Sequence, residues 1–206
     1  MDLIDLNSFT KLDISENVSY QTVYFTLFVS LVANGLTNIP SSQIVYLTFG
    51  YILTKNALIS PLIGILVGSI GNTLGNTILY KIIKRHSDFL NTKVAKFLNI
   101  DLVKLDYYMK QVKMRGSWWL VFGKCIPSLK VLVPIIVGLS EIETKKAVSI
   151  FFLGSLLWAT IVTYLGYHFG KTANLLQFYL VVTCIYIVIG LITSYKIKKN
   201  SKDNKQ

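Results

Sequence analysis

The sequence predicts an all-α integral membrane protein: four transmembrane helices plus two re-entrant helical hairpins, arranged as an inverted repeat. The 206-residue chain is 52% hydrophobic and has a mean hydropathy of +0.53. Charged residues are absent from four long stretches: 17–54, 56–80, 147–170 and 172–195. Soluble proteins keep charges on the outer faces of their helices, so these stretches indicate a lipid environment. The triplet Ile-Pro-Ser interrupts two apolar regions, at 39–41 and 126–128, which predicts broken helices.

The first half of the chain begins with a polar or interfacial segment, residues 1–17, followed by a single membrane domain over 18–195. A first span is predicted from about Tyr20 to Leu36. The uncharged stretch is too long for one span, so the segment from Asn38 to Thr54 is predicted to be a re-entrant hairpin.

A second span is predicted from about Ala57 to Ile83, which ends a first repeat of about 34–83. Its small-xxx-small steps predict close helix packing at Gly64, Gly68, Gly71 and Gly75. The connector 84–116 is predicted to be an amphipathic helix on the cytoplasmic interface, because apolar residues recur at helical spacing at Leu102, Leu105, Met109 and Val112.

The second repeat is predicted over about 117–170. It contains a broken region from Trp118 to Leu139 and a third span from about Ala147 to Tyr167. A last span of about 175–195 leads to a basic tail, 196–206. Aromatic residues near the span ends are interpreted as anchors at the membrane interface, namely Trp118, Trp119, Trp158 and Tyr167.

The net charge of +11 is concentrated in the connector and the tail. The positive-inside rule therefore places both in the cytoplasm and the chain in the cell membrane. The same rule explains the basicity without a nucleic-acid partner. With this orientation the first hairpin enters from outside and the second from inside, which makes the two repeats inverted.

The two prolines, Pro40 and Pro127, are interpreted as the hairpin breaks, together with Gly50 and Gly138 at similar offsets. A helix that begins inside the membrane presents unpaired N–H groups and the positive end of its dipole. Two such ends facing one another would favour an anion. The alternative is a pair of proline kinks in ordinary spans, and the repeated triplet counts against it.

Two lysines, Lys124 and Lys130, flank Pro127 inside an otherwise apolar stretch. A charge in the membrane usually marks a pathway or a partner, and no carboxylate lies in the predicted membrane core. The ligand would then supply the counter-ion, and phosphate is the obvious group. The alternative is that the lysines extend to the cytoplasmic surface. The predicted headgroup-binding residues are Lys124, Lys130, Asn34, Gln43, Ser41, Ser42 and Ser128.

Enzyme and metal chemistry are not predicted. Nucleophile-elbow, P-loop and zinc-protease patterns are absent from the sequence. His86 and His168 lack acid or cysteine partners at ligand spacing, so neither a metal nor another cofactor is expected. Asn72 and Asn76 are amides at membrane depth, with substrate contact and helix-to-helix hydrogen bonding as equal alternatives.

Motifs across roughly residues 30–170 form a specific combination: N-G-L-T-N-I-P-S-S-Q (34–43), G-N-T-L-G-N-T-I-L-Y (71–80), F-G-K-C-I-P-S-L-K (122–130) followed by Gly138, then Trp158 and G-Y-H-F-G (166–170). The combination resembles the DedA family, the bacterial and archaeal members of the group that shares the VTT (SNARE-associated Golgi protein) domain. The resemblance implies two facing re-entrant hairpins and a role in moving lipids.

The chain departs from that family where Asn34 and Gln43 stand in place of two acidic residues, and Lys124 and Lys130 in place of two arginines. Amides do not titrate, so proton coupling through them is lost, whereas a lysine still holds phosphate as a point charge. The leading hypothesis is a flippase or scramblase for an anionic phosphate-bearing lipid, such as an undecaprenyl-type phosphate or a phospholipid. The alternatives are a proton- or ion-dependent small-molecule exporter in envelope homeostasis and a membrane scaffold. Whether the chain forms a homo-oligomer stays open.

Overall fold

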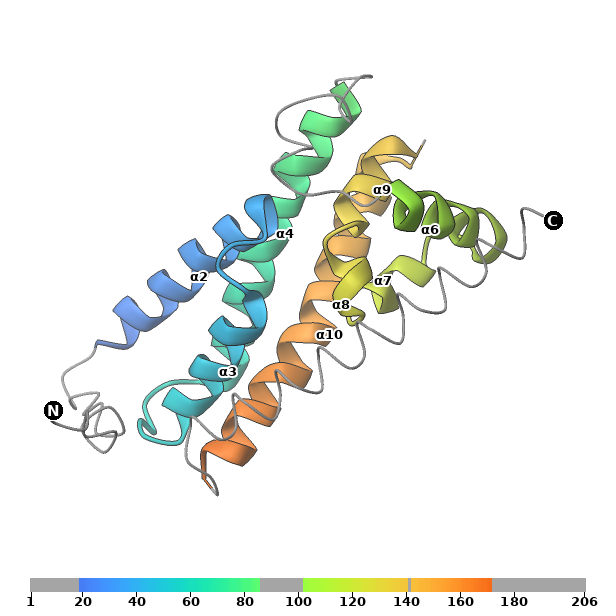
Figure 1. The fold of residues 1–206 in the computed structure, drawn as a ribbon. Helices are drawn as coiled ribbons and strands as arrows, with labels where there is room; N and C mark the ends of the chain where they lie inside the picture. The colour runs from blue at the N-terminus through green and yellow to red at the C-terminus, as the bar shows by residue number, and fades with distance from the viewer. Residues whose placement is uncertain (1–18, 86–101, 141, 172–206) are drawn as a thin grey trace, which may run out of the picture.

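Two long antiparallel helices form the centre of the fold. A computed structural model describes residues 19–85, 102–140 and 142–171. Within them, α4 (Pro61–Arg85) and α10 (Thr144–Gly170) lie side by side and run in opposite directions (Figure 1). Both are long and apolar enough to cross a membrane. They correspond to the predicted second and third spans. The predicted fourth span, the segment 1–17 and the tail 196–206 lie outside the described residues.

The first broken region consists of two helices that meet at a tight turn. Helix α2 (Tyr20–Thr37) ends at Asn38, which adopts a left-handed conformation with φ 63°, and α3 (Ser42–Leu53) begins after Pro40. The chain reverses direction at this turn (Figure 1). Helix α2 packs along α4, whereas α3 packs along α10. Helix α2 has nearly the bounds predicted for the first span, Tyr20–Leu36, and α3 lies within the segment predicted to be a hairpin, Asn38–Thr54. We call α2 and α3 the two arms of the first broken region and the turn between them its tip.

The second broken region consists of three short helices: α7 (Trp119–Gly123), α8 (Pro127–Lys130) and α9 (Val133–Leu139). The backbone at Ile126 is extended, and Pro127 is the first residue of α8. The helical path is therefore interrupted just before Pro127. Helix α9 packs against the second half of α4, and α7 packs against α10. The second break thus reaches the middle of the molecule from the end opposite to the first (Figure 1).

Glycines at helix contacts bring the two arms close to the long helices. A Cβ on Gly35 would lie 2.5 Å from the carbonyl oxygen of Asn72, and one on Gly166 would lie 2.5 Å from that of Leu47. The predicted small-residue steps on α4 are confirmed as packing positions, since Gly71 and Gly75 meet the backbone of α2 in the same way.

Two glycines have a role different from the predicted one. Gly50 lies inside α3, and Gly138 lies inside α9, so neither is a break. A Cβ on Gly50 would collide with the carbonyl oxygen of Thr163, and one on Gly138 would lie 2.7 Å from the Ile83 side chain. Both positions need a small residue because another helix approaches closely there.

The connector helix α6 (Leu102–Arg115) is amphipathic, as predicted. Leu105 and Tyr108 are buried, while Asp106 and Lys110 are exposed and form a salt bridge of 2.9 Å. The buried face packs with α7 and α9, so it contacts protein as well as any membrane surface.

The apolar core is divided by a polar layer. One apolar cluster includes Tyr80, Ile136 and Phe151, and the other includes Leu31, Tyr46 and Val162. Between these clusters lie buried polar side chains, namely Asn34, Ser42, Ser69, Asn72, Thr73, Asn76, Lys124 and Ser155. Both chain breaks end in this layer.

Candidate functional site

Lys124 follows α7 and points into the polar layer. Its Nζ donates hydrogen bonds to Asn72 Oδ1 at 2.9 Å, to Ser155 Oγ at 2.8 Å and, more weakly, to the Phe151 carbonyl oxygen at 3.5 Å. The residue is only 2% exposed. Gly154 leaves room for the stem, because a Cβ there would lie 2.8 Å from Lys124 Cδ. An ammonium group has three donors, so neutral oxygens occupy all of them. The alternative in which Lys124 extends to water is excluded.

Asn72 on α4 is the centre of this hydrogen-bond network. Its Oδ1 accepts from Lys124, from Ser155 Oγ at 2.8 Å and from Asn76 Nδ2 at 2.8 Å. Its Nδ2 donates to Asn34 Oδ1 at 2.9 Å, and Asn34 Nδ2 donates to the carbonyl oxygen of Pro40 at 2.6 Å. A continuous chain of hydrogen bonds therefore joins the second broken region to the tip of the first.

Lys130 is the last residue of α8 and extends toward the start of α3. Its ammonium group donates to Ser42 Oγ, which also accepts from Trp158 Nε1 at 3.3 Å. The Lys130 Nζ lies 5.5 Å from the centroid of the Trp158 ring, within reach of a cation–π contact. Among the described residues, Ser42 is the one hydrogen-bond partner recorded for this ammonium group. Two of its donors can therefore still take a ligand.

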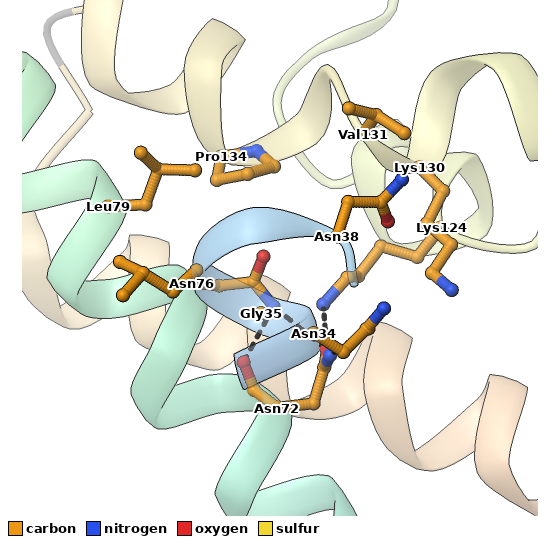
Figure 2. A pocket seen from close by; sticks show the side chains of 11 residues that line it. Asn34, Gly35, Asn38, Asn72, Asn76, Leu79, Lys124, Lys130, Val131 and Pro134 are labelled. Carbon is orange, nitrogen blue, oxygen red and sulfur yellow. Dashed lines mark hydrogen bonds between the residues drawn. The ribbon is translucent and has the colours of Figure 1, made fainter. Parts of the chain in front are cut away.

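A small cavity lies between the two lysines and the asparagines (Figure 2). Its volume is about 20 Å³, which is room for about one water molecule. Figure 2 shows side chains from α2, α4 and the second broken region converging on it. The lining polar residues are Asn34, Asn38, Asn72, Asn76, Lys124 and Lys130. The site is nearly closed in this conformation.

Four of the predicted headgroup residues come together in the polar layer: Asn34, Ser42, Lys124 and Lys130. Gln43 is half-buried on α3 and Ser41 is exposed at the turn, and neither lines the cavity. The side chain of Ser128 lies outside the described set.

Sequence reasoning missed two members of the site. The sequence predicts no role for Ser155, and it predicts an interface anchor at Trp158. The anchor interpretation is wrong, because Trp158 is 7% exposed and donates to Ser42. Their positions on α10, three residues apart, face the two lysines respectively.

The electrostatic character of the site is cationic. Two lysines reach buried neutral oxygens, and in the described part of the chain neither forms a salt bridge with a carboxylate. A buried charge without an opposite partner is costly, so binding of an anion would relieve it. The geometry suits a group with several acceptor oxygens, because ammonium and amide groups converge on one small space.

Comparison with known families identifies the fold family. The family model of the VTT domain matches residues 39–168, more than half of the chain. The match begins at the first break and ends two residues before the end of α10, so it contains both lysines and Asn72. No significant match was found among curated proteins or among solved structures. The protein belongs to the VTT domain family and is a membrane protein of the DedA family.

Proposed function

We propose that this protein moves an anionic phosphate-bearing lipid between membrane leaflets, as a flippase or scramblase without enzymatic activity. The observation that carries the proposal is the environment of Lys130. Its ammonium group lies where the two chain breaks meet, with a serine hydroxyl as its recorded partner among the described residues. Phosphate is the anionic group that membranes supply in quantity, and it accepts several charge-assisted hydrogen bonds at once.

The two lysines have different roles in this proposal. Lys124 is fully coordinated by Asn72, Ser155 and the Phe151 carbonyl, so it acts as a fixed positive charge and as a link between α4 and α10. Lys130 has a single hydrogen-bond partner among the described residues, Ser42 at the start of α3 in the first broken region. Lys130 is therefore the residue that contacts phosphate directly.

Transport requires the closed site to open. The cavity of about 20 Å³ is too small for a phosphate headgroup, so the two broken regions must separate. The hydrogen bonds that must rearrange include Lys130–Ser42, Trp158–Ser42 and the Lys124–Asn72 bond of the chain that joins the two broken regions. Rocking of one repeat against the other around a fixed site is the usual way in which transporters with broken helices alternate access.

The proposed membrane placement follows the charge distribution. Helices α4 and α10 cross the bilayer together with two further spans, for four in all, and the broken regions enter from opposite leaflets. The connector 84–116 and the tail 196–206 lie in the cytoplasm of a cell-membrane protein, because their lysines obey the positive-inside rule.

A liposome assay tests the proposal. Purified protein is reconstituted with fluorescent phosphatidic acid or phosphatidylcholine in separate vesicles, and dithionite quenching reports movement between leaflets. Wild type should exchange the anionic lipid faster than empty liposomes. Lys130→Ala should slow exchange by roughly 10- to 100-fold, the effect of losing one hydrogen bond to a charged group.

Two variants control the experiment. Lys130→Arg keeps the charge and should retain transport, whereas Lys113→Ala removes an exposed lysine of α6 and should have no effect. Exchange equal to that of empty liposomes for wild type would contradict the proposal. Transport of a small molecule that depends on a proton or sodium gradient, without any lipid exchange, would instead support an exporter.

A further inference from the structure

A groove lies between the two arms of the first broken region. Its volume is about 440 Å³, within the range of small-molecule binding sites. Residues of α2 and α3 line it, with Pro40 at the turn that joins them: Thr22, Val23, Thr26, Leu27, Ser30, Pro40, Ile44, Val45, Thr48, Phe49 and Ile52. The lining contains no charged side chain.

The groove exists because the two arms pack on different partners. Helix α2 follows α4 and helix α3 follows α10, so the arms diverge from their common tip (Figure 1). From Thr22 to Ser30 the groove extends along two turns of α2, about 12 Å at the helical rise per residue. A hydrocarbon chain of medium length has matching dimensions.

One end of the groove adjoins the cationic site. Pro40 lines the groove, and its carbonyl oxygen accepts from Asn34, which lines the cavity between the lysines. Two residues further on, Ser42 accepts from Lys130. A molecule with its polar end at Lys130 and an apolar chain attached would reach the groove by passing the turn at Pro40.

The surroundings of the groove are suited to lipid. Phe25 and Val29, on α2 outside the lining, are 69% and 48% exposed, and Ile44, in the lining, is 55% exposed. In the membrane proposed for this protein, such side chains face lipid acyl chains. An acyl chain would therefore enter the groove directly from the apolar interior of the bilayer. Entry costs no polar desolvation, and it fills space that would otherwise lack contacts.

We infer that the groove between α2 and α3 holds one hydrocarbon chain of the same anionic lipid whose phosphate binds Lys130. The inference rests on the proposed function and adds a recognition element to it. The headgroup passes between the two breaks while this chain stays against the first hairpin. Selectivity would then depend on chain length as well as on charge.

Photo-crosslinking tests the inference. The full chain is reconstituted in phosphatidylcholine liposomes that contain a trace of phosphatidic acid with a diazirine on one acyl chain. Peptide mass spectrometry then locates the labels. We expect labels on 22–30 and 44–52 in excess over the outward face of α4 around Leu62 and Leu66, which are 67% and 38% exposed.

A matched pair of variants isolates the groove. Thr26→Trp places an indole among the lining residues, whereas Val29→Trp places one on an exposed position of the same helix outside the lining. Thr26→Trp should reduce labelling of 44–52 about tenfold, as expected if a few methylene contacts are displaced. Val29→Trp should leave that labelling unchanged. Equal effects of the two variants, or labels spread evenly over all exposed apolar faces, would overturn the inference.

Further arms separate this inference from the proposed function. Lys130→Ala should reduce groove labelling by the phosphatidic acid probe and leave labelling by a phosphatidylcholine probe unaltered. If Lys130→Ala leaves groove labelling by the phosphatidic acid probe unchanged, the proposed link between the groove and the headgroup site is wrong. Wild-type lipid exchange that depends on Lys130 but not on Thr26 would leave the transport proposal standing and reject the groove. Loss of the transport proposal itself requires wild-type liposomes that exchange no lipid.

Discussion

The role of Asn72 as the centre of the polar layer leads to a quantitative prediction. Asn72→Leu keeps the branched shape of the side chain but removes the acceptor shared by Lys124, Ser155 and Asn76, and the donor to Asn34. Neutral hydrogen bonds between helices in a membrane contribute about 0.6 kcal/mol each. A hydrogen bond to a charged group contributes about 1.5–3 kcal/mol, so the ammonium contact dominates. The total loss of unfolding free energy should be about 4 kcal/mol.

A double-mutant cycle separates the charge from the amides. In Asn72→Leu the Lys124 ammonium stays buried with one acceptor fewer, whereas Lys124→Met removes the charge and keeps the length of the side chain. The double variant should therefore recover about 2 kcal/mol relative to Asn72→Leu alone. Unfolding by SDS in mixed micelles measures these differences, and Asn56→Leu, which removes one hydrogen bond in the turn after α3, is the control. Additive effects of the two substitutions would refute the assignment of Lys124 as a structural cation.

Further predictions concern packing, the membrane orientation and Trp158. Gly75→Ala should detach α2 from α4 and destabilise the fold by several kcal/mol, because its Cβ would lie 2.9 Å from Gly35 Cα and from the Leu36 nitrogen. SDS unfolding measures this loss, and an unchanged unfolding midpoint would contradict the packing. In a Cys125→Ala/Cys184→Ala background, Asn56→Cys should react with an impermeant maleimide from outside intact cells and Lys145→Cys should not; the reverse pattern would invert the proposed orientation. Trp158→Phe removes the N–H that Ser42 accepts but keeps a ring near Lys130, so lipid exchange should accelerate about two- to fivefold if opening limits transport; slower exchange would argue against Ser42 as part of the closed gate.

The breaks could be predicted from the sequence because proline acts locally. Pro40 lacks the backbone N–H that a continuous helix needs, and Pro127 begins a helix, so each interruption is visible in a few adjacent letters. The long uncharged stretches that predict α4 and α10 are equally local signals. Both helices lie in the apolar segments that the sequence indicates. The connector helix followed from apolar spacing alone.

The contacts inside the site could not be predicted because they depend on tertiary register. Asn34 and Asn72 are 38 residues apart, and Lys130 meets Ser42 across 88 residues. The local sequences of α2 and α4 do not specify which turn of α4 faces α2. The same is true of Gly50 and Gly138: a small residue is compatible with a break or with a close helix, and only the neighbouring helix decides. Trp158 was misassigned for this reason as well.

The first broken region shows what a local signal leaves open about architecture. Residues 20–36 are uncharged and long enough for a span, and the sequence predicts one there. In the structure α2 ends against the middle of α4, where Gly35 approaches Asn72, and the chain turns back toward the end it came from. The length and hydropathy of a segment therefore predict that a helix lies in an apolar environment, but they do not predict which part of the fold its end contacts.

Contact between Lys130 and lipid phosphate is the central claim, and solid-state NMR can measure it directly. Protein with ¹⁵N-labelled lysine side chains is reconstituted with phosphatidic acid, and nitrogen–phosphorus dipolar coupling is recorded for wild type, Lys130→Met and Lys124→Met. We predict a coupling that corresponds to roughly 4 Å, the separation set by a direct ammonium–phosphate hydrogen bond, present in wild type and Lys124→Met and lost in Lys130→Met. A coupling pattern identical in wild type and Lys130→Met would contradict the account.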